Sequence, residues 1–341
     1  MLDDVSGCWR SSRLPLCQNA CRTGPTPAHK TPAPPAATDS APRTGHRMTD
    51  SALLHTSFYK FVHLPQPAAV AAHLRWLTAL PAHPVLGSVL VAPEGINGML
   101  AGSPQAINAI EQALLADPAL GAAFTGMAFK RSACKTAPFH RMKVHVKAEI
   151  VPLGITGVDA TRAAGTQVSP LAWRTLIRQD DVVLLDNRNS FEFRLGRFAG
   201  AIDPQVGNFR DFPAYVLAHA EAWQATGKRV AMYCTGGIRC EKTSAWMASL
   251  GLPVWQLAGG ILNYFAQTPD AHQDWQGECF VFDNRVALDT GLQETATSLA
   301  QVYTGAPDGA WRLARAQRLA SFDADTDVKA GAAPAPGPGP G

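Results

Sequence analysis

The segment from Lys228 to Trp246, KRVAMYCTGGIRCEKTSAW, constrains the fold of this chain more than any other. The apolar run 230–233 is short and is bounded by charges on one side and glycines on the other, which is typical of an interior strand in an α/β sheet. A helical pattern follows over 241–250 and stops at Gly251, a residue suited to the position after a helix. Cys234 therefore lies where a strand passes into a helix.

Cys234 is a candidate nucleophile because of what surrounds this junction. The first N–H groups of a helix have no internal partner and point at whatever lies ahead of them. Gly236 and Gly237 allow successive N–H groups to converge on one point, and Arg239 adds a positive charge. These features predict a pKa of Cys234 below that of a free thiol. The alternative is a small core residue, the usual environment of a free cysteine. The predicted active-site loop consists of Thr235, Gly236, Gly237, Ile238 and Arg239.

The length of this loop separates two chemistries. Arg239 lies five residues after Cys234. Cysteine phosphatases have one more residue between the cysteine and the arginine, which makes a loop wide enough for a phosphate group. The shorter loop resembles that of rhodanese domains, where the cysteine holds a persulfide. Cys240 is either a resolving thiol or a core residue in the first helical turn, and the second is our expectation.

Composition limits the class of protein. The 341 residues suffice for two domains with tails, and the formal charge of +3 permits a nucleic-acid partner without requiring one. The seven cysteines form no C-x-x-C pair, and no apolar run approaches the length needed to cross a bilayer. The N-terminus has no apolar region typical of a secretory signal. We therefore expect a reduced, cytoplasmic protein with no metal site, no membrane partner and no obligatory protein partner.

The order of predicted elements indicates an α/β protein of two domains. The order β-α-β-β-α-β from Phe58 onward predicts a ferredoxin-like (acylphosphatase-like) α+β domain, in which Gly95 and Gly98 flank a turn. From Ser169, strands alternating with helices predict a domain with a central parallel sheet, and the resemblance of the Cys234 loop implies that this domain is rhodanese-like. Residues 1–47 have a disordered composition, and Met48 is a candidate translation start. The predicted segments are 1–47, disordered extension; 48–152, ferredoxin-like domain; 153–168, linker; 169–273, rhodanese domain; 274–303, appended segment; and 304–341, disordered tail.

The end of the first domain is rich in basic residues. Alternation along 141–147 places Arg141, Lys143, His145 and Lys147 on one sheet face, with Met142, Val144 and Val146 facing inward. A strip of positive charge suits a phosphate backbone, and a solvated sheet face accounts for the same pattern. The candidate RNA-binding residues are Lys130, Lys135, Arg141, Lys143 and Lys147.

Asp186 and Arg188 form a second candidate pair at a strand end. Because parallel strands end at one edge of the sheet, Asp186 and Cys234 are expected on the same rim. The two charged residues either shape the pocket or form an ion pair that orders the loop.

Together, several segments resemble one family, the bacterial rhodanese-containing oxygen-dependent tRNA uridine hydroxylases. They cover about 58–289, and the run CTGGIRCEK is more specific to this family than to rhodanese domains in general. The matching segments are FYKFVHL, APEGINGMLAGS, KVHVKAEIV, DNRNSFEFRLGRFAGAI, FRDFPAYV, MYCTGGIRCEKTSAWM, QLAGGILNYF and WQGECFVFDNRVALD. The resemblance implies 5-hydroxylation of the wobble uridine of tRNA with molecular oxygen, and it places Cys234 at the family's active-site cysteine. Many relatives carry a cysteine-rich stretch after the last of these segments, whereas residues 291–306 contain no cysteine.

Three functional hypotheses follow. In a hydroxylase, Cys234 attacks C6 of the uracil in the tRNA anticodon loop, or carries an oxidised sulfur that delivers oxygen. In a sulfurtransferase, Cys234 carries a persulfide. A tRNA-binding module without activity is disfavoured because Cys234 and Arg239 are both intact. No cofactor motif is identified, and molecular oxygen is the expected co-substrate.

Overall fold

The protein is described by a computed structural model over residues 53–162 and 164–318. The disorder predicted for residues 1–47, and for the end of the tail over 319–341, lies outside these ranges. Within the described ranges, no helix is both long and apolar enough to cross a membrane.

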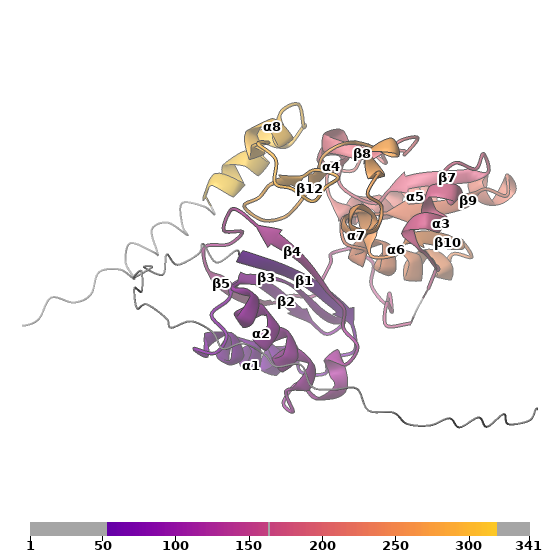
Figure 1. The fold of residues 1–341 in the computed structure, drawn as a ribbon. Helices are drawn as coiled ribbons and strands as arrows, with labels where there is room; N and C mark the ends of the chain where they lie inside the picture. The colour runs from indigo at the N-terminus through magenta and orange to yellow at the C-terminus, as the bar shows by residue number, and fades with distance from the viewer. Residues whose placement is uncertain (1–52, 163, 319–341) are drawn as a thin grey trace, which may run out of the picture. The chain divides into compact units, whose positions relative to one another are not determined.

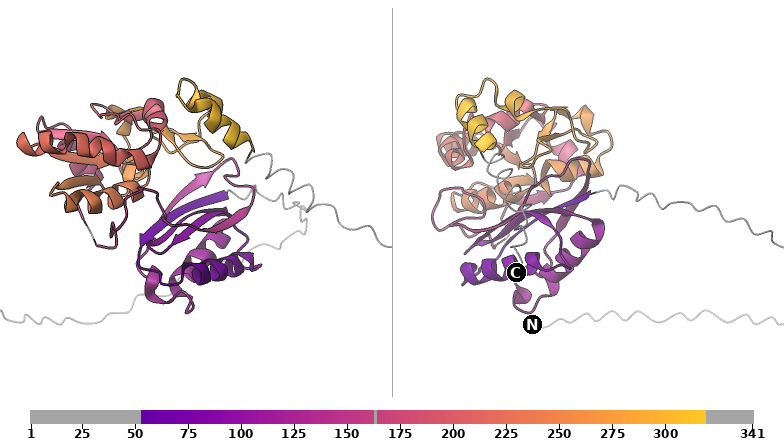
Figure 2. Two further views of the ribbon diagram at one scale, coloured as in Figure 1. Left: turned by 180° about the vertical axis from the view of Figure 1, so that it is seen from behind. Right: turned by 90° about the vertical axis from the view of Figure 1, so that its left-hand side faces the viewer.

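The first domain is a five-stranded sheet with two helices on one face (Figures 1 and 2). The strand order is β4-β1-β3-β2-β5, in which β5 is parallel to β2 and the other neighbours are antiparallel. The first four strands and the two helices make the predicted ferredoxin-like arrangement, and β5 extends one edge. The elements are β1 (Leu53–Phe61), α1 (Pro67–Ala79), β2 (Leu86–Ala92), β3 (Gly95–Gly102), α2 (Pro104–Ala116), a 3-10 turn (Gly121–Phe124), β4 (Phe129–Cys134) and β5 (Met142–Val146).

The turn expected around Gly95 and Gly98 is a strand instead. Only residues 93–94 form the hairpin turn, and β3 begins at Gly95. A Cβ atom on Gly98 would lie 2.3 Å from the ring of Phe58 on the neighbouring strand. The glycine therefore serves close packing between strands.

Side chains of β1 point alternately to the two faces of this sheet. Phe58 packs with the apolar residues of α1 and α2. Phe61, on the opposite face, belongs to a second cluster with Met232 and Cys234 of the other domain. The face without helices is thus covered by the second domain.

The second domain has a parallel sheet in the order β6-β10-β9-β7. Asp186 ends β7 and pairs in register with Tyr233, the residue before Cys234, which confirms the predicted shared edge. β6 lies inside the predicted linker. The elements are β6 (Thr166–Val168), α3 (Pro170–Leu176), β7 (Val182–Asp186), α4 (Ser190–Leu195), β8 (Gly196–Phe198), a 3-10 turn (Phe209–Asp211), α5 (Phe212–Ala225), β9 (Arg229–Tyr233), α6 (Ile238–Ser249), β10 (Val254–Leu257) and α7 (Gly260–Gln267).

The segment after α7 contacts both domains. β11 pairs with β8 of the second domain, whereas Asn284, in the turn between β12 and β13, bonds through its N–H to the carbonyl of Pro138 in the first. The elements of this segment are a 3-10 turn (Ala271–Gln273), β11 (Trp275–Gly277), β12 (Cys279–Phe280), β13 (Ala287–Leu288) and α8 (Leu299–Tyr303).

The expectation of disorder from residue 304 onward is wrong for the part of the tail that the structure describes. Residues 309–318 are helical. Arg312 holds this helix to the second domain, because its guanidinium lies 4.9 Å from the ring centre of Phe191 and donates to the carbonyl of Gly207. The prediction of disorder rested on the Ala/Gly-rich composition, which carries no information about these contacts.

Candidate active site

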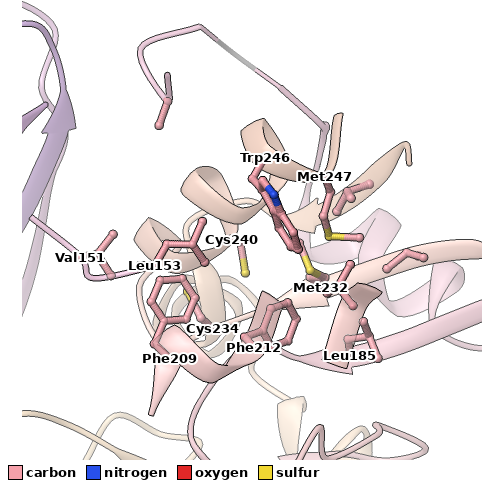
Figure 3. Packing of buried hydrophobic residues seen from close by; sticks show 14 of the residues in the cluster. Val151, Leu153, Leu185, Phe209, Phe212, Met232, Cys234, Cys240, Trp246 and Met247 are labelled. Carbon is pink, nitrogen blue, oxygen red and sulfur yellow. The ribbon is translucent and has the colours of Figure 1, made fainter. Parts of the chain in front are cut away.

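Cys234 lies at the end of β9, and α6 begins four residues later at Ile238. Gly237 adopts a left-handed conformation with φ of 99°, which turns its N–H toward the thiol. The distance from this nitrogen to Cys234 Sγ is 3.1 Å. Figure 3 shows the sulfurs of Cys234 and Cys240 within the same apolar cluster as Phe209 and Met232. Only 1% of the Cys234 surface is exposed.

The environment of Cys234 favours the thiolate. Burial alone opposes ionisation, but a hydrogen bond from the Cys240 thiol, the charge of Arg239, and the N–H groups of Cys240 and Gly237 outweigh it. The pKa of Cys234 therefore lies well below the ordinary value for a thiol, whereas burial and the neighbouring thiolate raise the pKa of Cys240 well above it. This agrees with the predicted activation. Cys240 is core-facing in the first turn of α6, as expected, and donates to the thiolate.

Arg239 holds the loop through a partner that sequence reasoning missed. Its two terminal nitrogens each lie 2.8 Å from an oxygen of Glu192, whose side chain is fully buried. One of these nitrogens also donates to the hydroxyl of Thr235, at 3.2 Å. Glu192 forms a capping box with Asn189 at the start of α4. The three-residue spacing from Asn189 to Glu192 is a sequence signal that could have identified Glu192 as a structurally important residue.

Asp186 and Arg188 form the ion pair that was the alternative expectation, and their role in shaping the pocket stays a prediction. Both side chains are completely buried, and Arg188 donates to the two Asp186 oxygens at 2.8 and 2.5 Å. Its guanidinium also lies over the rings of Tyr233 and Trp275, at 5.5 and 5.3 Å from their centres. Full burial makes this pair part of the domain's interior.

The first domain supplies two side chains that contact the loop. The Tyr59 hydroxyl donates to Glu241 at 2.9 Å, and its oxygen would lie 3.0 Å from a Cβ atom on Gly237. Lys130 donates to the carbonyls of Gly236 and Gly259, the latter at 3.1 Å. Lys130 thus contacts one carbonyl of the loop and one of the turn before α7, and its predicted binding to RNA stays a prediction. Tyr59 was not predicted, because no sequence pattern links β1 to α6.

Lys242, the residue after Glu241 in α6, joins the two domains. This lysine is 1% exposed. Its ammonium group lies 2.7 Å from a carboxylate oxygen of Glu94, 2.5 Å from one of Glu149, and 3.1 Å from the carbonyl of Val151. A buried ammonium with two carboxylates and a carbonyl is well compensated. These three charged residues occur in three of the sequence segments that indicated the family, and their pairing was not predicted.

The remaining basic residues are divided between two edges of the first sheet. Lys135 follows β4 at one edge, whereas Arg141, Lys143 and Lys147 lie along β5 at the other. Lys135, Arg141 and Lys147 are exposed and Lys143 is half-buried. The predicted alternation fails at Val146, which is 43% exposed because β5 ends there. Residues close in sequence are thus separated by the order of the strands.

Within residues 53–162 and 164–318, no group of three or more His, Cys, Asp or Glu side chains is placed to hold a metal ion. The features that do converge are an ionisable cysteine, a strand–loop–helix unit and a ferredoxin-like domain that contacts the loop. They define a rhodanese-type cysteine protein with an acylphosphatase-like partner domain. Two family models agree with this class: the UPF0176 acylphosphatase like domain matches residues 53–150, and the Rhodanese-like domain matches residues 170–267.

Relatives named tRNA uridine(34) hydroxylase extend the match over most of the chain. The protein of this name from Nitrobacter winogradskyi is 46% identical over 259 residues, which are 74% of this chain and 97% of the relative. Those from Brucella anthropi and Teredinibacter turnerae are 42% and 41% identical, over 72% of this chain and 78% and 74% of their own lengths. The chain belongs to the tRNA uridine(34) hydroxylase family.

Proposed function

We propose that this protein is an oxygen-dependent oxidoreductase that hydroxylates C5 of the wobble uridine in the tRNA anticodon loop, with Cys234 as the nucleophile. The observation that carries the proposal is the thiolate environment of Cys234 within a chain 46% identical to a tRNA uridine(34) hydroxylase. A tRNA substrate would be met in the cytoplasm, and molecular oxygen would be the co-substrate.

The first chemical step suits a stabilised thiolate. Attack of Cys234 Sγ forms a bond to C6 of the uracil, and the electrons of the C5–C6 double bond move toward C5 and O4. This addition needs no outside electrons and makes C5 electron-rich toward oxygen. Oxygenation then places one atom of O2 on C5 and reduces the other to water, with two electrons and two protons from a cellular two-electron donor. Loss of the C5 proton then expels the Cys234 thiolate from C6 and restores the C5–C6 double bond.

Access to the thiol requires movement at the contact between the domains. Cys234 is almost fully buried, and Tyr59 and Lys130 of the first domain lie against its loop. A base that contacts the sulfur must be unstacked from its neighbours, as the anticodon loop permits. The hydrogen bond between Tyr59 and Glu241 crosses this contact. We expect this hydrogen bond to break when tRNA binds.

The test is nucleoside mass spectrometry of total tRNA from cells that lack the gene and are complemented with wild type, Cys234→Ser or Cys279→Ser. Cys279 is a matched control, because it is a completely buried thiol outside the loop and burial raises its pKa to about 12. We expect wild type and Cys279→Ser to restore 5-hydroxyuridine derivatives and Cys234→Ser to leave them at background.

The second candidate function is sulfur transfer, favoured by the match of residues 170–267 to the rhodanese-like domain. Normal hydroxyuridine together with a loss of thiolated nucleosides in the deletion strain would support it. No change in either class of nucleoside would contradict both functions.

A further inference from the structure

An aromatic side chain projects from the turn between β12 and β13. Phe282 is 53% exposed, whereas Phe280 and Val281 before it are 3% and 4% exposed. The side chains of Asp283 and Arg285 that follow are 1% and 2% exposed. Single exposed apolar side chains are common on protein surfaces, so the exposure of Phe282 gains meaning only from the groups that surround it.

The turn that carries Phe282 is held on several sides. The Phe280 ring packs edge-on against Phe282, with centres 5.0 Å apart, and also against Phe191, at 5.1 Å. Arg285 donates to Asp283 and to the Ser132 hydroxyl of β4, at 2.8 and 2.9 Å. Phe282 is therefore presented on an anchored turn, and little conformational freedom remains to be lost on binding.

Phe282 lies beside the active-site loop. The guanidinium of Arg239, the last residue of that loop, is 5.8 Å from the centre of the Phe282 ring. One part of the ring covers this arginine, and about half of the side chain faces solvent. A molecule that stacks on the open part would thus lie next to the loop that contains Cys234.

The turn also contacts the segment that joins β4 to β5. The Asn284 side chain bonds to the carbonyl of Ala137 and to His140, at 3.2 and 3.1 Å. These contacts place the turn against residues 135–141, a segment that begins with Lys135 at the β4 edge of the sheet and ends with Arg141 at the β5 edge. Cationic side chains that attract a backbone, next to an aromatic ring that accepts a base, are how proteins bind single-stranded nucleic acid.

We propose that Phe282 is a stacking platform for a base of the tRNA anticodon loop, and that stacking there positions the neighbouring uridine for Cys234. This inference rests on the proposed function and adds a positioning residue to it. Stacking accepts any base, so Phe282 contributes to affinity and to placement of the strand, and choice of the uridine rests with the loop.

The experiment compares Phe282→Ala, Phe282→Leu and Phe282→Trp with Trp76→Ala as a matched control. Leucine keeps an apolar cover over Arg239 but has no flat ring, and tryptophan enlarges the ring. Trp76 is equally exposed, at 56%, but lies on α1, on the far face of the first sheet. The probe is an anticodon stem-loop RNA that contains the wobble uridine, used with the full-length protein.

Binding is followed by titration of a 2-aminopurine base next to the uridine, and hydroxylation by KM and kcat in cell extract. We expect the Ala and Leu variants to bind about tenfold to a hundredfold more weakly, with a raised KM. The Trp variant and Trp76→Ala should bind like wild type. Iodoacetamide alkylation of Cys234 should be unchanged in all of them, since the loop itself is intact.

Three results would overturn the inference. The first is wild-type binding by Phe282→Leu, which would make Phe282 only a cover for Arg239. The second is an equal loss in Trp76→Ala, and the third is altered alkylation of Cys234 with unchanged RNA binding. Failure of the proposed function is seen separately: a wild-type protein that binds the RNA through Phe282 but never yields hydroxyuridine would contradict hydroxylation alone.

Discussion

The tripeptide Asp-Asn-Arg occurs twice in this protein, at 186–188 and at 283–285, with the same local geometry. In both copies, the arginine N–H and Nε donate to one aspartate oxygen, and a terminal nitrogen donates to the other. The surroundings differ. Arg188 lies against two aromatic rings inside the second domain, whereas Arg285 donates to Ser132 and Cys134 of the first. The same local motif therefore completes a core in one place and joins two domains in the other.

The largest expected difference concerns the arginines. We expect Arg188→Met to lower the free energy of unfolding by about 3–5 kcal/mol, because it leaves Asp186 charged and completely buried. Arg285→Met should cost less, about 2 kcal/mol, since His55 Nε2 lies 3.7 Å from Asp283 and can take up a proton to compensate. Urea denaturation of both variants measures the difference between their free energies of unfolding.

The double variant Asp186→Leu, Arg188→Met is the control for the interior copy, because removal of both charges should recover most of the loss. Equal losses in Arg188→Met and Arg285→Met would show that the two surroundings do not differ in energy.

The next effect in size is a pH dependence specific to the second copy. Burial, aided by the charge of Arg285, lowers the pKa of His55 from 6.5 to about 4, although Asp283 opposes this. In the unfolded chain His55 binds a proton below pH 6.5, whereas the folded protein does not until about pH 4. Stability is therefore fully present above pH 6.5 and falls as the pH decreases toward 4, by about 3 kcal/mol.

His55→Gln should remove this component from the pH profile of the unfolding midpoint, and His272→Gln, at an exposed position, should leave it in place. In Arg285→Met the slope should be shallower, because one of the causes that lower the His55 pKa is lost. An unchanged slope in His55→Gln would refute the assignment.

The smallest expected difference concerns the middle residue of each copy. Asn187 is buried and donates to the Thr243 hydroxyl at 3.0 Å, whereas Asn284 is exposed. Asn187→Ala should cost about 1–3 kcal/mol because it leaves a buried hydroxyl unpaired, and Asn284→Ala about 0.5 kcal/mol or less. Thermal unfolding of the two variants decides this, and a larger shift for Asn284→Ala would reverse the expected order.

What could be predicted from the sequence was local. The junction at Cys234 was recognised because the strand, the glycines and Arg239 are neighbours in the chain, and the ion-pair alternative for Asp186 and Arg188 needed only two residues. The order of strands and helices in the ferredoxin-like domain followed from hydrophobic periodicity. The exception is β3, because its glycines were interpreted as the ends of a turn.

What could not be predicted depends on residues far apart in the chain. Glu192 lies 47 residues from Arg239, and Tyr59 lies 182 residues from Glu241. Lys130 could be classed only by its charge, because its partners are backbone carbonyls that any residues could supply. Hydrophobic periodicity carries no information about such pairs.

Lys242 sets a limit on how this enzyme can be divided. Its two carboxylate partners, Glu94 and Glu149, both belong to the first domain. A rhodanese-like fragment expressed alone would keep the lysine and lose both anions, and the other fragment would keep two glutamates without their cation. The two halves are thus mutually dependent, and recombination that exchanges either one for an unrelated module would have to replace this charge cluster as well.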